Sequence, residues 1–219
     1  MKIDFHIHTN YSKDSLNSIE KVRKICLKKG ILPCITDHNT IKGALAYQKK
    51  YGEDSCIVGE EIMTKQGELI GIYLTRFISS NMSVLKTIKE IFSQGGLLII
   101  PHPFDKLRKS KLHYDLNKLK KICPTMFIET YNSRTIFAYD NKKAKDFAMK
   151  NKLYFVVGSD AHTLHEIGNS YVILDNFNIK DKNAFLETFK KKNIKIHTNS
   201  SSFLVHVFTK LLKYFKMPF

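Results

Sequence analysis

The chain has 219 residues, of which 43% are hydrophobic and 26% are charged, and its formal net charge at pH 7 is +16. This composition excludes an intrinsically disordered chain, and the length suits one large α/β domain. No window approaches the ~18 consecutive apolar residues of a membrane span, and the N-terminus lacks the apolar core of a signal peptide. We therefore expect a cytoplasmic protein without a membrane span, and leave its oligomeric state open.

The positive charge raises the question of a nucleic-acid partner, because basic surfaces attract polyanions. Only four of the 36 Lys and Arg residues are arginines, however, whereas arginine is the residue expected for bidentate phosphate contacts. We interpret the charge as a solvated, lysine-rich surface, so a nucleic-acid partner stays possible without being favoured. The four cysteines show no C-x-x-C spacing and lie in or beside apolar runs, which predicts buried free thiols.

Short apolar runs alternate with helical patterns along the chain. The runs with the length of strands are residues 2–7, 31–36, 55–60, 68–74, 96–101, 125–130, 153–158 and 170–174. Helical periodicity is found in the segment from Leu16 to Gly30 and at 81–93, 115–122, 138–150 and 181–192. This alternation predicts βα units around a mostly parallel sheet, either closed or open.

Residues 200–219 close the chain with apolar side chains at helical spacing and lysines on or beside the other face. Such a basic amphipathic helix could lie on a membrane surface. Docking onto the domain formed by residues 1–199 explains the same pattern, and we favour it because apolar stripes usually face a core.

The first strand carries two histidines, His6 and His8, in the stretch "DFHIHTNYSKDS". Side chains at i and i+2 leave a strand on the same face, so the two imidazoles should point together while Phe5 and Ile7 enter apolar packing. Asp14 follows six residues later. One face of this strand is therefore polar and needs partners.

Ionisable side chains recur at the ends of the other predicted strands. They are Asp37 and His38, Glu60 and Glu61, His102, Glu129, and Asp160 and His162. In a parallel barrel the carboxyl ends of the strands open onto one face, where such folds assemble their sites. Imidazoles and carboxylates without a thiolate suit Zn²⁺, Mn²⁺ or Fe²⁺, and so many ligands imply two or three ions. Ions so arranged can clamp a phosphate and activate water, which favours phosphoester hydrolysis.

The ordered series H-x-H, T-D-H, G-x-E, P-H-P and G-S-D-A-H, from His6 to about Gly168, resembles the PHP (polymerase and histidinol phosphatase) family. The resemblance implies a single-domain distorted (β/α)7 TIM-like barrel with a two- or three-metal site and phosphoesterase activity. By motif it assigns His6, His8, Glu61 and Asp160 to one ion, Glu61, His102 and Glu129 to a second, and Asp14, His38 and His162 to a third.

Several positions depart from the family pattern or extend it. Many family members have a histidine where this chain has Glu129. Glu68 is either a ligand or a solvated hairpin residue, and we favour the solvated residue. Glu60 should point away from Glu61 on the strand and be structural. Asp37 is expected to orient a metal-bound imidazole.

Two further residues are candidates for contact with a phosphorylated substrate. Arg134, in the loop after Glu129, is predicted to bind its phosphate, and His165 is a weaker candidate for protonating the leaving group. The favoured function is hydrolysis of a small phosphomonoester or nucleotide-like phosphate. A nuclease acting on single-stranded or short nucleic acid and a non-catalytic metal-bound scaffold are the alternatives.

Overall fold

The computed structural model describes residues 1–191, 194–202, 205 and 209. Most of the predicted C-terminal helix, residues 200–219, therefore lies outside the described residues. The elements are β1 (Lys2–Ile7), α1 (Ile19–Lys29), β2 (Ile31–Ile35), α2 (Lys42–Tyr51), β3 (Ile57–Thr64), β4 (Gly67–Ile72), α3 (Val84–Ser93), β5 (Leu97–Ile100), α4 (Leu116–Ile122), β6 (Phe127–Asn132), α5 (Ala138–Lys150), β7 (Tyr154–Gly158), β8 (Tyr171–Ile173), α6 (Lys182–Lys190) and β9 (Lys195–His197).

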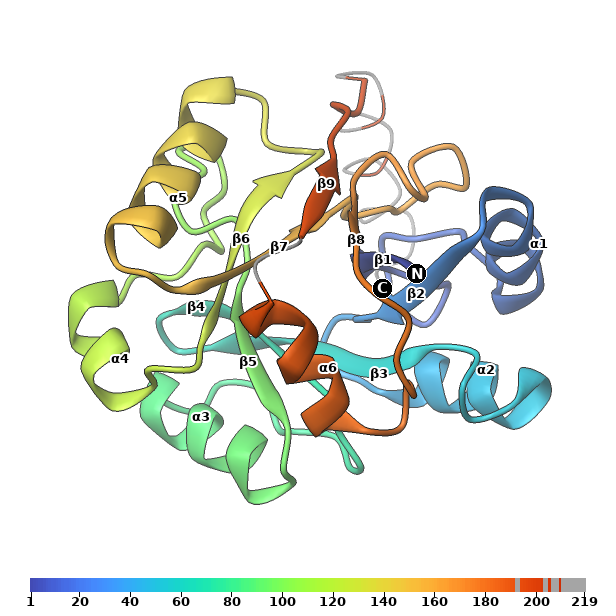
Figure 1. Cartoon of the computed structure of the whole chain (residues 1–219), viewed down its shortest axis with the longest axis horizontal. Helices are drawn as coiled ribbons and strands as arrows, with labels where there is room; N and C mark the ends of the chain where they lie inside the picture. The colour runs from blue at the N-terminus through green and yellow to red at the C-terminus, as the bar shows by residue number, and fades with distance from the viewer. Residues whose placement is uncertain (192–193, 203–204, 206–208, 210–219) are drawn as a thin grey trace, which may run out of the picture.

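The strands form a barrel with an irregular seam (Figure 1). β1, β2 and β3 pair in parallel, as do β5, β6 and β7, and the antiparallel strand β4 joins the two groups. Beyond β7, Ala161 pairs with Ile7, and the His8 amide donates to the Ala161 carbonyl at 3.0 Å. This contact brings the first and seventh strands together, so the predicted distorted seven-stranded barrel is confirmed. β8 and β9 extend the sheet antiparallel beside β1.

Helix boundaries follow local signals in the sequence. The side chain of Ser18 caps α1 by accepting from the Lys21 amide, so the helix begins at Ile19 and not at Leu16. Gly30 ends it in the left-handed conformation, with φ of 64°. α2 was not predicted: its N-cap residue, Ile41, makes no capping bond, and its first turn has no acidic residue. The short strand β9 was also missed.

The core has two parts, and they lie at different depths. One cluster lies between the outer helices and the barrel and includes Ile7. The other fills the barrel interior, where Phe185 and Phe189 of α6 pack on Phe5 and Phe127. Phe5 and Ile7 therefore enter different clusters, because the register of β1 shifts between Asp4 and Ile7.

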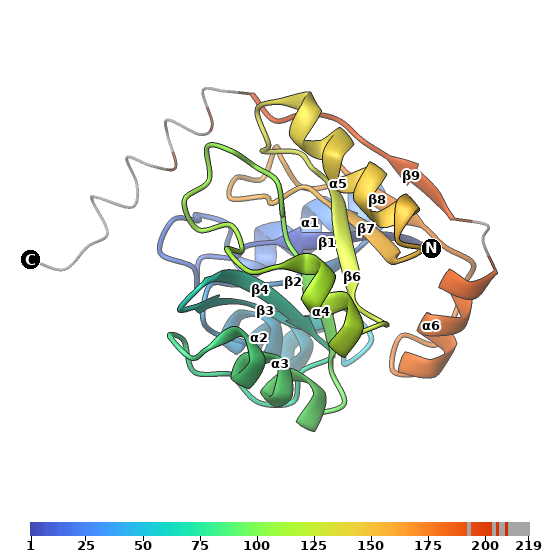
Figure 2. The same cartoon turned by 90° about the vertical axis from the view of Figure 1, so that its left-hand side faces the viewer.

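α6 closes the barrel at the amino ends of the strands, and the long connection from β5 to α4 extends at the opposite end (Figure 2). The carboxyl ends of the strands are thus left to carry polar side chains. All four cysteines are buried and free, as predicted. Among the described helices, none combines the length and the hydropathy that a bilayer-spanning segment requires.

Candidate metal centre

Four side chains meet where β1 and β7 end and beside the middle of β3. His6 Nε2 and His8 Nε2 lie 3.3 Å and 3.4 Å from Glu61 Oε2, and 3.6 Å and 3.3 Å from Asp160 Oδ1. All four atoms are buried without a hydrogen-bond partner among the described residues. Orphaned buried polar atoms are costly, so four of them pointing at one another fit a cation between them.

The imidazoles are held in the orientation that metal binding requires. His6 Nδ1 is 3.0 Å from Glu129 Oε1, His8 Nδ1 is 3.2 Å from Ser12 Oγ, and His162 Nδ1 is 2.8 Å from the Asp160 carbonyl. A proton on each Nδ1 satisfies these acceptors and leaves the Nε2 lone pair free. This is how ligating histidines are usually oriented.

A second set surrounds the same Glu61. His102 Nε2 lies 3.1 Å from Glu61 Oε1, and His38 Nδ1 lies 3.1 Å from Glu61 Oε2. His38, Glu61 and Glu68 can each offer one ligand atom, and the three atoms lie within 4.8 Å of one another. Glu68 is only 4% exposed, so the expectation of a solvated hairpin residue was wrong. The turn between β3 and β4 folds it inward.

The third predicted set also converges. Asp14 Oδ2 lies 3.5 Å from His38 Nε2, and Asp14 Oδ1 lies 3.4 Å from His162 Nε2. His8, His38 and His162 can moreover offer three nitrogens within 4.8 Å of one another. The third set therefore shares His38 with the second and lies beside His8 of the first.

Glu129 lies behind the first set. Its Oε1 contacts His6 Nδ1, and its Oε2 accepts from the His102 amide at 2.7 Å and from the Asn132 side-chain amide at 3.1 Å. Both oxygens are thus engaged on the side of His6 away from Nε2. This placement speaks against the predicted ligand role and indicates that Glu129 orients His6.

Most of the chain matches two protein-family models. The model of the PHP domain matches residues 4–150, and the model of the PHP-associated region matches residues 138–194. The chain belongs to the PHP family. An uncharacterized protein of Methanocaldococcus jannaschii is 35% identical over 182 residues, which cover 82% of this chain and 73% of that protein.

Two solved structures are similar in fold to this chain at low sequence identity. A two-domain protein from Bacteroides vulgatus, containing a predicted PHP-like metal-dependent phosphoesterase, has a TM-score of 0.70 at 16% identity. The match covers 91% of this chain but 65% of that one, so this chain spans less than two thirds of its length. A lesion-specific endonuclease from Pyrococcus furiosus has a TM-score of 0.62 at 14% identity, covering 89% and 57%.

Asp37 supports the PHP centre through a relay and not by direct contact. Its carboxylate accepts from the Thr9 amide and hydroxyl, each at 2.6 Å, and from Ser12 Oγ at 2.8 Å. Because the Ser12 hydroxyl donates to Asp37, it is left to accept from His8 Nδ1. The predicted orienting role of Asp37 therefore reaches His8 through Ser12.

Arg134 and His165 make no contact with the metal-ligand set among the described residues. The Arg134 side chain is 7% exposed, its Nε lies 3.6 Å from Glu166, and its Nη2 donates to Thr209. These contacts do not support the predicted phosphate-binding role. His165 is exposed in the loop after β7, which leaves its role as a proton donor an untested prediction.

Arg108 is the basic residue that sequence reasoning missed. It donates from Nη2 to Asp160 Oδ2 at 2.7 Å, the oxygen opposite the one that faces His6 and His8. Among the described residues it is the only Lys or Arg that forms an ion pair with one of the proposed ligands. Its position in the long β5–α4 connection could not be inferred from periodicity.

Two of the proposed ligands, His102 and Asp160, are among the non-glycine residues with a positive φ. His102 and Asp160 have φ angles of 31° and 54°, in the left-handed region that side chains with a Cβ seldom adopt. Each of them is the second residue after the last residue of its strand, β5 or β7. Strain of this kind persists where the surrounding structure holds it, and it is common at functional sites.

Charge is distributed unevenly over the cluster. Burial alone would lower the pKa of His6, but Asp160, Glu61 and Glu129 hold it well above its usual range. Burial, with repulsion from His162 and His38, lowers the pKa of His8 to about 3. The neighbouring imidazoles overcome burial to hold the pKa of Glu61 well below its usual range. A neutral His8 beside an ionised Glu61 is ready to bind a cation, whereas His6 would have to release the second proton that these carboxylates hold on it.

Glu60 points away from the centre, as expected. It is buried, its Oε2 accepts from the Ile78 amide at 2.8 Å, and its Oε1 has no partner among the described residues. Burial, partly offset by that hydrogen bond, raises the pKa of Glu60 to about 7. An ionised carboxylate here is therefore destabilising at neutral and alkaline pH.

Replacing Glu60 with glutamine should stabilise the protein above pH 7. Because folding raises the pKa of the Glu60 carboxyl, the folded protein loses stability as the pH rises from about 4.5 to about 7. The amide removes this loss, so we expect a gain of at most about 3 kcal/mol at pH 8 that fades toward pH 4.5. Urea unfolding at pH 5 and pH 8 measures it; an equal effect at both pH values would contradict the account.

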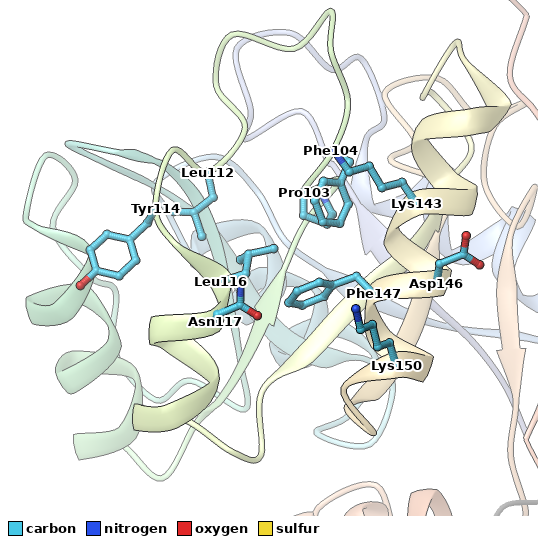
Figure 3. A pocket seen from close by; sticks show the side chains of 10 residues that line it. All are labelled: Pro103, Phe104, Leu112, Tyr114, Leu116, Asn117, Lys143, Asp146, Phe147 and Lys150. Carbon is cyan, nitrogen blue, oxygen red and sulfur yellow. The ribbon is translucent and has the colours of Figure 1, made fainter.

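A separate hollow of about 450 Å³ lies outside the centre, between α4 and α5 (Figure 3). Phe104 and Phe147 form its apolar wall, with Lys143 and Lys150 at the edge. One of its lining residues, Pro103, directly follows His102 in the chain. None of its lining side chains belongs to the ligand sets, so the hollow is not the metal site.

Proposed function

We propose that this PHP protein is a metal-dependent phosphoesterase that hydrolyses a small phosphomonoester or a nucleotide-like phosphate. The observation that carries the proposal is the meeting of four orphaned buried atoms, from His6, His8, Glu61 and Asp160. Family membership and the PHP-like phosphoesterase in the related fold support it. The donor set of nitrogens and oxygens suits two or three ions of Zn²⁺, Mn²⁺ or Fe²⁺.

The residues divide among the ions as follows. His6, His8, Glu61 and Asp160 would hold the first ion, Glu61, Glu68, His38 and His102 would serve the second, and Asp14, His38 and His162 would serve a third. Glu68 takes the place first given to Glu129, because its oxygens face His38 and His102. Glu129 and Asp37 would hold the imidazoles in place.

The chemistry follows from the donor set and from burial. Bound divalent ions at such a site supply Lewis acidity, which activates water and stabilises charge on a phosphoryl group. The protein orients the imidazoles through Glu129, Ser12 and the Asp160 carbonyl, and it keeps bulk water from His6, His8 and Glu61, which are fully buried. Proton donation to the leaving group by His165 stays a proposal.

The decisive experiment combines metal analysis of the purified protein with a substrate screen of phosphomonoesters, nucleoside bisphosphates and short oligonucleotides. We expect two or three divalent ions per chain and hydrolysis that is lost in His8→Ala while the barrel stays folded. A metal-loaded protein inert toward every ester would refute the phosphoesterase and support the scaffold alternative.

Adding the correct metal should also raise the thermal unfolding temperature. An ion that binds only the folded state stabilises it by about 2.7 kcal/mol at 100 times its dissociation constant. Differential scanning fluorimetry with and without a chelator measures the shift, and His8→Ala should reduce it strongly. An unchanged unfolding temperature on chelation of the metal-loaded wild type would contradict a metal site of this affinity.

A nuclease is the second candidate, and the net charge of +16 is the observation that favours it. The related endonuclease fold is compatible with this activity. Binding through phosphate contacts weakens steeply with salt, so oligonucleotide cleavage should fall with ionic strength while hydrolysis of a small ester should not. Equal, modest salt dependence for both substrates would eliminate the nuclease.

A further inference from the structure

The metal-ligand cluster opens to solvent through a small set of side chains. His38, Arg108 and Asp14 are 24%, 20% and 14% exposed, whereas His6 and Glu61 are fully buried. A substrate that reaches the buried atoms must therefore pass the three exposed side chains. Two of them belong to the proposed ligand sets, and Arg108 does not.

Arg108 is carried by a strap, residues 105–113, that crosses this opening. On one side the strap is fixed to the β3–β4 hairpin: Ser110 Oγ donates to Glu68 Oε2 at 2.5 Å, and the Glu68 amide donates to the Ser110 carbonyl at 2.8 Å. On the other side Arg108 reaches Asp160. The strap thus spans the centre from Glu68 to Asp160.

The strap completes a ring of contacts around the buried atoms. Going round, the members are Asp14, His38, Glu68, Ser110, Arg108, Asp160 and His162. Carboxylates and imidazoles supply most of this ring, and Arg108 is its one permanently charged cation. An anionic substrate entering through the ring meets this guanidinium beside the ions.

The guanidinium also has hydrogen-bonding capacity to spare. Arginine presents five N–H donors, and among the described residues Arg108 makes one hydrogen bond, to Asp160. Its Nε lies 3.7 Å from Asp105 Oδ2, an ion pair without a hydrogen bond. Donors therefore remain for a ligand at a partly exposed position, in the fork geometry that matches phosphate oxygens.

We infer that Arg108 binds the phosphoryl group of the substrate at this opening and that the group is a terminal phosphate. The strap is bonded to Glu68 on one side of the centre and to Asp160 on the other. A phosphate with one substituent can enter with its free oxygens first, whereas a phosphodiester must accommodate a second substituent against the ring. This inference rests on the proposed phosphoesterase function and names its substrate class, a phosphate monoester.

The test is calorimetric titration of the metal-loaded protein with inorganic phosphate, so its readout is independent of turnover. Arg108→Ala should weaken phosphate binding at least about 10-fold, as expected for loss of a charge-assisted hydrogen bond, and Arg108→Lys should restore part of it. Metal affinity should change much less than phosphate affinity, because the Asn132 side-chain amide still donates to Asp160 Oδ2 at 3.2 Å. Arg76→Ala is the matched control, because Arg76 is 56% exposed and pairs with Glu90.

The outcomes separate the two claims. Unchanged phosphate binding in Arg108→Ala overturns the inference, as does a loss of metal affinity equal to the loss of phosphate affinity, which would show that Arg108 only balances Asp160. Diphenyl phosphate binding as tightly as inorganic phosphate overturns the monoester assignment. Arginine-dependent phosphate binding without hydrolysis of any ester supports the inference and refutes the proposed phosphoesterase.

Discussion

Glu61→Gln is expected to abolish hydrolysis and to weaken metal binding by at least about 100-fold. Loss of a residue that only supports a ligand costs up to about 100-fold in metal affinity, and Glu61 is proposed as a ligand itself. The Glu61 carboxylate lies within 3.4 Å of four imidazoles, those of His6, His8, His38 and His102. Glutamine keeps the shape but removes the charge that the proposed first and second ions would share. Calorimetric titration with Zn²⁺ and Mn²⁺, together with ester hydrolysis, measures both effects.

Glu60→Gln is the matched control for this variant. It makes the same chemical change on the adjacent residue of β3, whose side chain points to the opposite face and bonds to the Ile78 amide. It should leave metal affinity and hydrolysis unchanged. Wild-type metal affinity in Glu61→Gln, in a protein that circular dichroism shows to be folded, would remove Glu61 from the site.

Much of the centre could be predicted because its residues lie at the ends of strands. The i, i+2 spacing of His6 and His8, and the positions of His38, Glu61 and Asp160 after apolar runs, express the barrel's own geometry. Once the strands are parallel, these side chains have to meet. The predicted ligands other than Glu129 do converge on one another.

The residues that sequence reasoning missed lie in segments whose path depends on tertiary contacts and not on a local sequence pattern. Glu68 enters the centre because β4 runs antiparallel and returns its first residues toward β3. Arg108 reaches Asp160 from a strap without helical or strand periodicity. Arg134 looked suitable from its place after Glu129, but Glu166 neutralises it in the interior. Sequence pattern does not reveal which of two loop arginines, Arg108 or Arg134, reaches the metal-ligand cluster.

Gly158→Ala should lower both stability and metal affinity, because Gly158 packs against His6 on the side of Glu129. A Cβ at this position would lie 2.4 Å from His6 Cβ and 2.6 Å from Glu129 Oε1, distances that β1 or β7 must shift to relieve. We expect a loss of about 1–3 kcal/mol in stability, as for an overpacked core. Displacing His6 from Glu129 should also cost about 10–100-fold in metal affinity. Chemical unfolding and metal titration measure the two effects.

Gly30→Ala separates loss of stability from damage to the site. Gly30 also adopts a backbone unfavourable for alanine, with φ of 64°, but a Cβ there meets no atom within 4 Å. We expect about 1–2 kcal/mol of destabilisation from the left-handed conformation and no change in metal affinity. If both glycine variants lost stability and neither lost metal affinity, the packing of Gly158 against His6 would not position this ligand. The same result would contradict the proposal that Glu129 orients the His6 imidazole.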